Sequence, residues 1–406
     1  MRRPAAVISG LGVIGPQGIG RPSLEAALLA GRPLPSEMDR SAGYHAADSS
    51  RLAALVPKLD FARWLPAAEA RRLSVPSRFA VSAARMAMED AGIASFEGRR
   101  VAVVLATAFG ALLFTEKLVR QILDEGPESA QPFYFSECVA NAAAARVAIA
   151  LGARGANITI TEREAGPVLA LMRAAHEVTS GRADVAIAGS ADEMTPLLHA
   201  LLDRFRGTAR ASRRHDEAAR PFDLNRDGVL AGEGATALVI EREADATARG
   251  ARPLARVGAT VAAFDPSASV SDWGSGEDAF GRALRAGVSR AGLRMEGIDL
   301  IVSGASGARR GDRLEAMTLA TAWGGASLPP VVVPKAVTGE FGGGLLASAV
   351  LATTGAKFGR PTAFATHDPS LPIALHDGAP LPAPGKVLIS TLAAGGAAAW
   401  AVLERP

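Results

Sequence analysis

The chain is poor in cysteine. Its 406 residues include a single one, Cys138. One cysteine excludes an intramolecular disulfide and argues for a reducing, cytoplasmic setting. It also means that any reactive thiol must be Cys138, which stands just before an alanine-rich helical pattern. A small apolar filler is the simpler interpretation of this side chain, and a reactive thiol stays open as the alternative.

Aromatic residues and concentrated charge are scarce as well. Two tyrosines and four tryptophans supply few stacking platforms for single-stranded nucleic acid. The net charge of +3 is spread thinly, apart from the arginine cluster between Arg204 and Arg214. Asp216 and Glu217 follow that cluster at once, so no basic stripe forms and no nucleic-acid partner is expected. The cluster is a solvated loop or a docking surface for an acidic protein.

Long hydrophobic runs are missing too. No stretch of about 18 uninterrupted apolar residues exists, so we expect no transmembrane helix. The opening Met1-Arg-Arg-Pro leads into a short apolar run that Gly10, Gly12 and Gly15 interrupt. This start fits a first strand better than a signal peptide.

Metal and cofactor motifs are incomplete. The six histidines show no ligand pair at i,i+4 spacing. The segment Asp223–Gly228 imitates the start of a calcium loop, but Glu233 falls one place early for the closing ligand. We therefore expect neither a metal nor a cofactor.

Apolar residues, in contrast, are plentiful. Hydrophobic residues make up 49% and charged residues 21%, as in globular proteins. Strand-like runs alternate with helical patterns, which predicts an α/β fold. They fall in two sets that suggest two related halves, residues 1–250 and 251–406, while Gly31–Asp60 is predicted to be a surface excursion. The predicted strands are Ala6–Gly10, Val101–Ala106, Asn157–Thr161, Val185–Gly189, Ala235–Ile240, Ala255–Ala263, Leu300–Gly304, Val331–Pro334, Val387–Ser390 and Ala399–Leu403.

The most informative segment is Ile158–Gly166. It is an apolar, β-branched run that ends in charge and leads through Gly166-Pro167 into a helical pattern. We predict a strand, a tight turn and a helix N-terminus. A cysteine in such a turn is easily activated, because the helix dipole favours the thiolate. The chain has Arg163 there, which stays protonated and cannot act as a nucleophile.

Three motifs carry a family resemblance. Val7–Pro16, Arg182–Asp192 and Arg220–Ala235 follow one another in order along the chain. They resemble the condensing enzymes of the thiolase superfamily, specifically the β-ketoacyl synthases. The resemblance implies a thiolase-like fold, with two related mixed-sheet α/β halves in a five-layered arrangement.

The resemblance also implies catalytic positions. The family uses one cysteine and two histidines to accept an acyl group, decarboxylate a malonyl unit and join the two. In this chain all three positions hold other residues, while Lys335, Asp312 and Glu315 keep their spacing, and the gating loop is degenerate at Leu392 and Ala394. The three vacated positions are Arg163, Gly304 and Glu340.

These losses resemble one branch of the family, the chain length factors. Such subunits do not condense acyl units themselves but pair with an active ketosynthase, which works on chains attached to an acyl carrier protein. By resemblance, this chain is a heterodimer subunit of a type II polyketide or polyene system and helps to bound chain length at an interface tunnel. The expected lining residues are Leu112, Leu113, Phe114 and Cys138.

Two alternatives remain open. One is an enzyme with altered chemistry, a decarboxylase or hydrolase that uses Glu340 as a general base near Lys335. The other is a homodimeric acyl-binding protein. We further predict that Arg163 and Glu340 form an ion pair that closes the vacated pocket, with Glu162 and Glu164 as competing partners.

Overall fold

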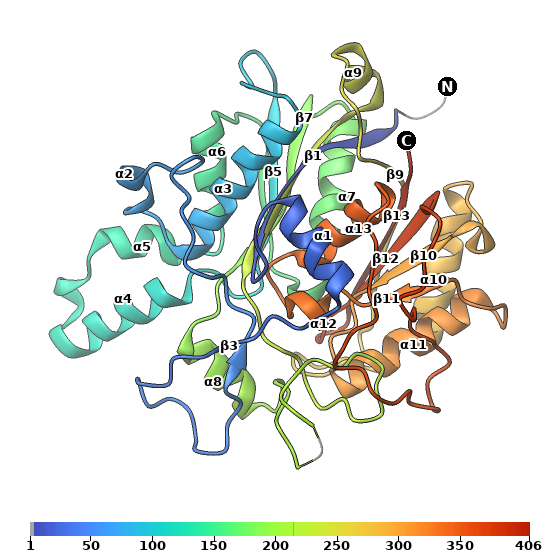
Figure 1. The fold of residues 1–406 in the computed structure, drawn as a ribbon. Coiled ribbons are helices and arrows are strands. Elements are labelled where there is room, and N and C mark those ends of the chain that lie inside the picture. The colour runs from blue at the N-terminus through green and yellow to red at the C-terminus, as the bar shows by residue number, and fades with distance from the viewer. Residues whose placement is uncertain (1–3, 214) are drawn as a thin grey trace.

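The computed structural model describes residues 4–213 and 215–406, so that residues 1–3 and Arg214 lie outside the described part. Figure 1 labels its elements. The strands are β1 Ala6–Gly15, β2 Gly18–Ile19, β3 Ser36–Glu37, β4 Leu52–Ala53, β5 Val101–Ala106, β6 Asn157–Ile160, β7 Val185–Asp192, β8 Gly234–Arg242, β9 Ala255–Phe264, β10 Leu300–Ser303, β11 Val331–Val332, β12 Lys386–Leu392 and β13 Ala397–Glu404. The α-helices are α1 Arg21–Ala30, α2 Ala67–Ala70, α3 Val75–Asp90, α4 Leu112–Glu125, α5 Pro132–Cys138, α6 Ala142–Leu151, α7 Gly166–Thr179, α8 Pro196–Arg204, α9 Glu243–Ala248, α10 Glu277–Arg290, α11 Arg309–Trp323, α12 Lys335–Thr338 and α13 Gly344–Thr353.

The sheet contains the same strand pattern twice. One half has the order β1-β8-β7-β5-β6, and the other has β9-β13-β12-β10-β11. In each half the first two pairs are antiparallel and the last two are parallel. The halves meet where β1 pairs antiparallel with β9. The two strand sets are separated in the chain by the segment that holds α9, close to residue 250.

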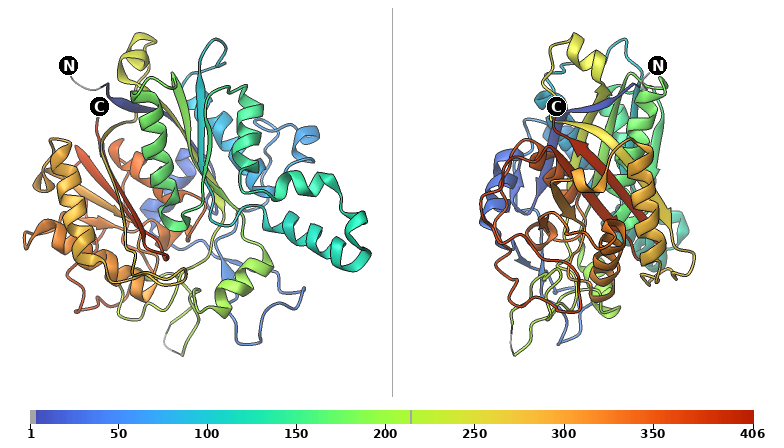
Figure 2. Two further views of the ribbon diagram at one scale, coloured as in Figure 1. Left: turned by 180° about the vertical axis from the view of Figure 1, so that it is seen from behind. Right: turned by 90° about the vertical axis from the view of Figure 1, so that its right-hand side faces the viewer.

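Helices cover both halves and separate them. Helices α3 and α6 pack on one outer face, and α10 and α11 pack on the other. Helices α7 and α13 lie between the two strand sets and contact both, which gives five layers of helix and strand (Figures 1 and 2). The α/β class predicted from the strand and helix patterns is confirmed.

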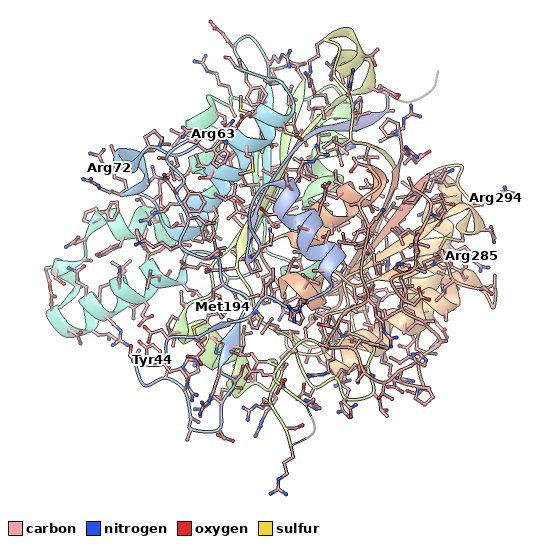
Figure 3. All side chains as sticks on the ribbon, viewed as in Figure 1. Tyr44, Arg63, Arg72, Met194, Arg285 and Arg294 are labelled. Atoms are coloured by element: carbon pink, nitrogen blue, oxygen red, sulfur yellow. The ribbon has the colours of Figure 1, made fainter. Side chains whose placement is uncertain are left out.

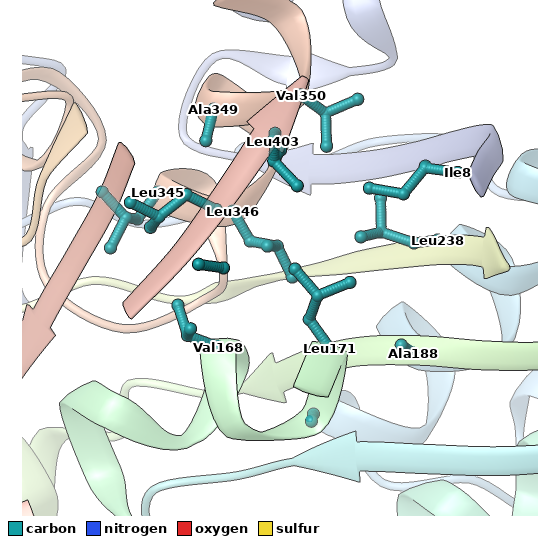
Figure 4. Packing of buried hydrophobic residues seen from close by; sticks show 14 of the residues in the cluster. Ile8, Val168, Leu171, Ala188, Leu238, Leu345, Leu346, Ala349, Val350 and Leu403 are labelled. Carbon is teal, nitrogen blue, oxygen red and sulfur yellow. The ribbon is translucent and has the colours of Figure 1, made fainter. Parts of the chain in front are cut away.

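The central helices have apolar side chains because strands cover them on two sides. Val168 and Leu171 of α7 are fully buried and pack in one cluster with Leu346 of α13 (Figure 4). In α13 every residue is buried. Burial of each large aliphatic side chain stabilises the fold by roughly 1.5–3 kcal/mol, so this layer ties the two halves together.

The first strand is longer than the glycines suggested. We predicted that Gly10 and Gly12 would interrupt the run, but β1 continues through both to Gly15. The reason is helix α3, which lies against the strand. A Cβ atom at Gly10 would sit 2.1 Å from the Ala87 carbonyl oxygen, and one at Gly12 would sit 2.0 Å from that of Ala83. These glycines permit close packing of helix on strand.

The segment Gly31–Asp60 is only partly the predicted surface excursion. Its middle is exposed, and Tyr44 reaches across to α4, where its hydroxyl donates to Glu116 (Figure 3). Ser50 and Ala53, in contrast, are buried. The Glu217 carboxylate accepts the backbone N–H groups of residues 51 and 52, which holds this stretch in the interior. The prediction was wrong there because a distant carboxylate supplies the hydrogen bonds.

None of the helices within residues 4–213 and 215–406 is both long and apolar enough to cross a bilayer.

Candidate functional site

Four segments meet where the parallel strands end. Arg163 follows β6, Gly304 follows β10, and Lys335 begins α12 after β11. Residues 392–396 comprise the end of β12 and the turn that follows it. The carboxyl ends of parallel strands lie at one edge of a sheet, so segments far apart in sequence are brought together. The turn Arg163–Ala165 contacts β12 and β13 directly. The predicted turn and helix start at Gly166-Pro167 are confirmed, with α7 beginning at Gly166.

The Arg163 guanidinium binds backbone carbonyl oxygens rather than a carboxylate. Its guanidinium Nη2 donates to the carbonyl oxygen of Val270 at 2.6 Å and to that of Ala394. Glu340 is engaged elsewhere, so the predicted Arg163–Glu340 ion pair is wrong. The physical reason is that other acceptors are available to Arg163. Its backbone has a positive φ of 38°, and its guanidinium meets carbonyl oxygens in the loops that carry Val270 and Ala394.

Glu340 pairs with Lys335. The Lys335 Nζ lies 2.5 Å from Glu340 Oε1, and both residues are buried, at 4% and 2% exposure. Glu340 also stands in the backbone framework, because its N–H donates to the carbonyl of Leu230 at 2.8 Å. In a buried ion pair of this kind each charge offsets the other, although Glu340 Oε2 has no hydrogen-bond partner. Glu340 is therefore a structural partner of Lys335 in this geometry.

Glu164 completes a charged cluster with Arg163, Lys335 and Glu340, all of which interact with it electrostatically. As a residue it is half-buried, but its carboxylate Oε2 is buried without a hydrogen-bond partner. Burial, together with the nearby Glu340 carboxylate, raises the pKa of Glu164 to about 7. Arg163 and Lys335 oppose this shift but do not cancel it. Sequence reasoning treated Glu164 only as a competing partner of Arg163. The one sequence signal that could have identified Glu164 as a buried acid is its place among the charged residues directly after the apolar strand.

Gly304 has no room for a side chain. A Cβ atom there would lie 2.7 Å from the Ser390 carbonyl oxygen and 3.2 Å from the Thr391 Cα. Both contacts are to the backbone of β12, which cannot move without disturbing the sheet. The position that the family resemblance assigns to a histidine is thus filled by the neighbouring strand.

The retained carboxylates Asp312 and Glu315 organise the loop after β10. Glu315 Oε1 accepts from the Ser303 hydroxyl at 2.9 Å, and Asp312 Oδ2 accepts from the Phe222 N–H at 2.8 Å. Burial raises the pKa of Glu315 to about 7 and that of Asp312 to about 6. Their hydrogen bonds go to this chain's own groups, so both residues support the loop.

The residues predicted to line a tunnel fall at the start of α4 and the end of α5. Leu112, Leu113 and Cys138 are half-buried, and Phe114 is buried. The ring of Phe114 packs against those of Phe133 and Tyr134, with centroids 5.6 and 5.3 Å apart. Leu112, Leu113 and Phe114 thus begin α4, Cys138 ends α5, and these two helices contact each other.

Two phenylalanines connect this place to the charged cluster, and sequence reasoning missed both. Phe341 follows Glu340 with a positive φ of 75°, and its ring meets the edge of the Phe109 ring at 5.0 Å. Leu112 belongs to the same apolar cluster. No sequence motif marks this contact, because residues 109 and 341 come from opposite halves of the chain.

The family resemblance assigns these positions to a nucleophile and two histidines. In this chain the first of them holds a permanent cation, and one of the histidine positions is filled by strand backbone. The remaining carboxylate of Glu340 faces an ammonium at 2.5 Å. What remains is a closed and internally paired site.

Comparisons with known proteins agree with the fold. Residues 4–246 match the family model described as "Beta-ketoacyl synthase, N-terminal domain". The chain is 30% identical over 354 residues to 3-oxoacyl-[acyl-carrier-protein] synthase 2 of Vibrio cholerae, which covers 84% of this chain and 83% of that protein. It is 32% identical over 330 residues to a putative polyketide beta-ketoacyl synthase 1 of Streptomyces cyaneus, with 78% and 76% covered.

A solved structure extends the likeness to the whole chain. The structure of the ishigamide ketosynthase/chain length factor superposes with a TM-score of 0.89 and 26% identity and covers 100% of both chains. The thiolase-like α/β fold implied by the motifs is therefore confirmed, including the large mixed sheet flanked by helices.

Proposed function

Because the chain belongs to the β-ketoacyl synthase family, we propose that it acts as a chain length factor, the non-condensing subunit of a ketosynthase heterodimer. The observation that carries this proposal is the state of the catalytic positions. Arg163 is bound to two carbonyls, Gly304 is packed against β12, and Glu340 is paired with Lys335. The scaffold is intact around a site that has no nucleophile at its centre.

A sheet edge supports pairing with a second subunit. Strand β6 is the last strand of its half and pairs only with β5 among the described residues. An open edge of this kind presents unpaired N–H and C=O groups to another chain. In the proposed heterodimer the active ketosynthase covers this edge, and acyl chains on a carrier protein are elongated with malonyl units in the partner's site.

Exposed apolar side chains next to that edge also support an interface with a second subunit at this surface. Five large hydrophobic residues of the α4–α6 region are more than two-fifths exposed. Helices α4 and α5 project from the body of the molecule (Figures 1 and 2). A gathering of exposed apolar side chains marks an interaction surface. These residues, which we call the α4–α6 face, are Val119, Leu123, Phe135, Val139 and Ile149.

The tunnel proposal uses residues beside this face. In our proposal Leu112, Leu113, Phe114 and Cys138 help to line the space that receives the growing chain. Their position at the α4–α5 contact, next to the α4–α6 face, supports this role. Larger side chains there would then shorten the product.

The arginine cluster offers a surface for the acyl carrier protein. Arg204, Arg206 and Arg213 are exposed, and Phe205 between the first two is 78% exposed. Exposed cations around an apolar side chain suit an acidic partner. Arg214, the last residue of the predicted cluster, lies outside the described residues.

Co-expression tests the proposal. The chain is produced with ketosynthases that keep the cysteine and both histidines, and condensation of a malonyl-carrier substrate is measured. We expect a stable one-to-one complex that is active, and no condensation by the chain alone. The matched control replaces the partner's catalytic cysteine with alanine, which should abolish all activity. Condensation, decarboxylation or hydrolysis by the isolated chain would contradict the proposal, and so would a homodimer that binds no ketosynthase.

A further inference from the structure

Two loops cover the vacated site, and we call them the mouth loops. They are residues 265–276, between β9 and α10, and residues 392–396, at the turn between β12 and β13. They are hydrogen-bonded to each other. The Asp265 N–H donates to the Gly396 carbonyl at 2.8 Å, and the Gly395 N–H donates to the Asp272 carbonyl at 2.7 Å.

One side chain joins both loops to the turn beneath them. Arg163 Nη2 donates to Val270 in the first mouth loop and to Ala394 in the second. The contact also restricts the second loop, because a Cβ atom at Gly395 would lie 2.6 Å from Arg163 Nη2. A charged donor makes stronger hydrogen bonds than a neutral one. Arg163 therefore fastens three segments that are remote in sequence.

The backbone of Arg163 is held in an unfavourable conformation. Its φ of 38° lies in the left-handed region, which side chains with a Cβ rarely adopt. Such a conformation persists only where the surroundings fix it. Here the two carbonyl contacts are the interactions that fix the side chain.

Two carboxylates that interact with each other near Arg163 are incompletely satisfied. Glu340 Oε2 and Glu164 Oε2 are buried without a hydrogen-bond partner. Unsatisfied buried polar groups are costly, and water relieves that cost when it can enter. Closed mouth loops therefore matter for these two oxygens, because opening would let water hydrogen-bond to them.

We propose that Arg163 is a positioning residue whose two hydrogen bonds hold the mouth loops closed, a contact that we call the bolt. A carrier-bound thioester then cannot enter this subunit and is confined to the partner's site. This inference rests on the proposed function for its biological meaning. The bolt itself is a property of the chain alone, so it can be tested without any partner.

The principal variant is Arg163→Gly. Glycine adopts the left-handed backbone without strain, so the variant removes the bolt while the turn remains favourable. Hydrogen exchange followed by mass spectrometry is measured on the full-length chain. We expect exchange at residues 265–276 and 392–396 to quicken by about tenfold or more, because opening exposes those amides. Arg163→Lys, which keeps the charge without the planar fork, should restore protection only in part.

A control variant separates the bolt from general loss of stability. Arg63 forms an exposed ion pair with Glu89, and Figure 3 places Arg63 far from α10 and α11. Arg63→Ala should leave exchange in the mouth loops unchanged. If Arg163→Gly alters only the global unfolding midpoint and leaves exchange of both mouth loops as in the parent, Arg163 is not a bolt.

A thiol placed behind the bolt gives a second readout. In a Cys138→Ser background, Glu164→Cys puts a single thiol in the buried cluster, and alkylation by iodoacetamide is timed with and without Arg163→Gly. We expect labelling to be slow with Arg163 present and at least about tenfold faster without it. Equal rates would overturn the proposal. Failure to bind any ketosynthase would instead contradict the proposed function and leave the bolt standing.

Discussion

At the scale of the single residue, Gly304 predicts that this position does not tolerate a histidine. The backbone of β12 occupies the place of a Cβ atom, with the Ser390 carbonyl oxygen 2.7 Å away. Gly304→His should therefore lower the free energy of unfolding by about 1–3 kcal/mol through overpacking. Urea denaturation measures the effect. Gly297→Ala is the control, because a Cβ atom there has no neighbour within 4 Å. If Gly304→His unfolds at the same urea concentration as the parent, β12 moves to accommodate the side chain and the prediction is wrong.

The raised pKa of Glu164 predicts that the free energy of unfolding depends on pH. Its pKa is about 7 in the folded chain, against 4.5 for an unperturbed glutamate. The folded state thus binds more protons between these values, and the stability from Glu164 is lost as the pH rises from about 4.5 through 7. Glu164→Gln should remove this slope and stabilise the chain at pH 8 by on the order of 2 kcal/mol.

Denaturation at pH 4, 6 and 8 measures that difference. At pH 4 the Glu164→Gln variant and the parent should be alike, since the carboxyl is protonated in both states. The exposed Glu97→Gln is the control and should show no pH-dependent gain. A gain that is the same at all three pH values would mean that Glu164 does not titrate in this window.

At the scale of the element, the segment 31–60 is attached to α8 by two histidines. His45 Nε2 lies 2.9 Å from His199 Nδ1, and His199 Nε2 lies 3.1 Å from the Leu52 carbonyl oxygen. A carbonyl only accepts, so His199 carries its proton on Nε2 and accepts from His45. Protonating His199 would add an N–H at Nδ1, which could then no longer accept from His45.

Burial lowers the pKa of both histidines, with Asp203 acting against it in each and Glu217 also opposing it at His199. Arg40 adds to the lowering at both. The folded state therefore binds fewer protons than the unfolded state, and this contribution to stability is lost as the pH falls below about 6.5. We expect limited proteolysis of residues 38–50 to quicken from pH 7.5 to pH 5. His199→Gln should make cleavage fast at both pH values, whereas the mutation His176→Gln on α7 should change neither.

At this scale the sequence was a good guide to strands and a poor one to their ends. All ten predicted strands are present, because apolar β-branched runs bounded by glycine follow the sheet period. β1 runs five residues beyond Gly10, to Gly15. The glycines that suggested its end serve the approach of α3, which local pattern cannot reveal.

At the scale of the whole molecule, the α4–α6 face predicts assembly. Leu123 is 77% exposed and Ile149 is 72% exposed. Leu123→Glu combined with Ile149→Glu should abolish co-purification with the ketosynthase, because burying two carboxylates at an interface is costly. The melting temperature of the chain alone should change by less than about 2 °C, since the replaced side chains contact mainly solvent.

Size-exclusion chromatography of the co-expressed pair measures this effect. Leu29→Glu is the matched control, because Leu29 is 57% exposed on α1, which lies away from α4 and α5 (Figure 1). Loss of the complex in both variants would point to a general solubility effect, and an intact complex in both would place the interface elsewhere.

The sequence by itself determined that the chain has the scaffold of the β-ketoacyl synthase family, because strand periodicity and motif spacing are local properties of a sequence. It could not determine what Arg163 does. The sequence suggested the carboxylate of Glu340, which belongs instead to Lys335. The actual partners are carbonyls 107 and 231 residues away along the chain. Every peptide unit carries such an acceptor, and only the folded arrangement of the mouth loops decided which of them the guanidinium would meet.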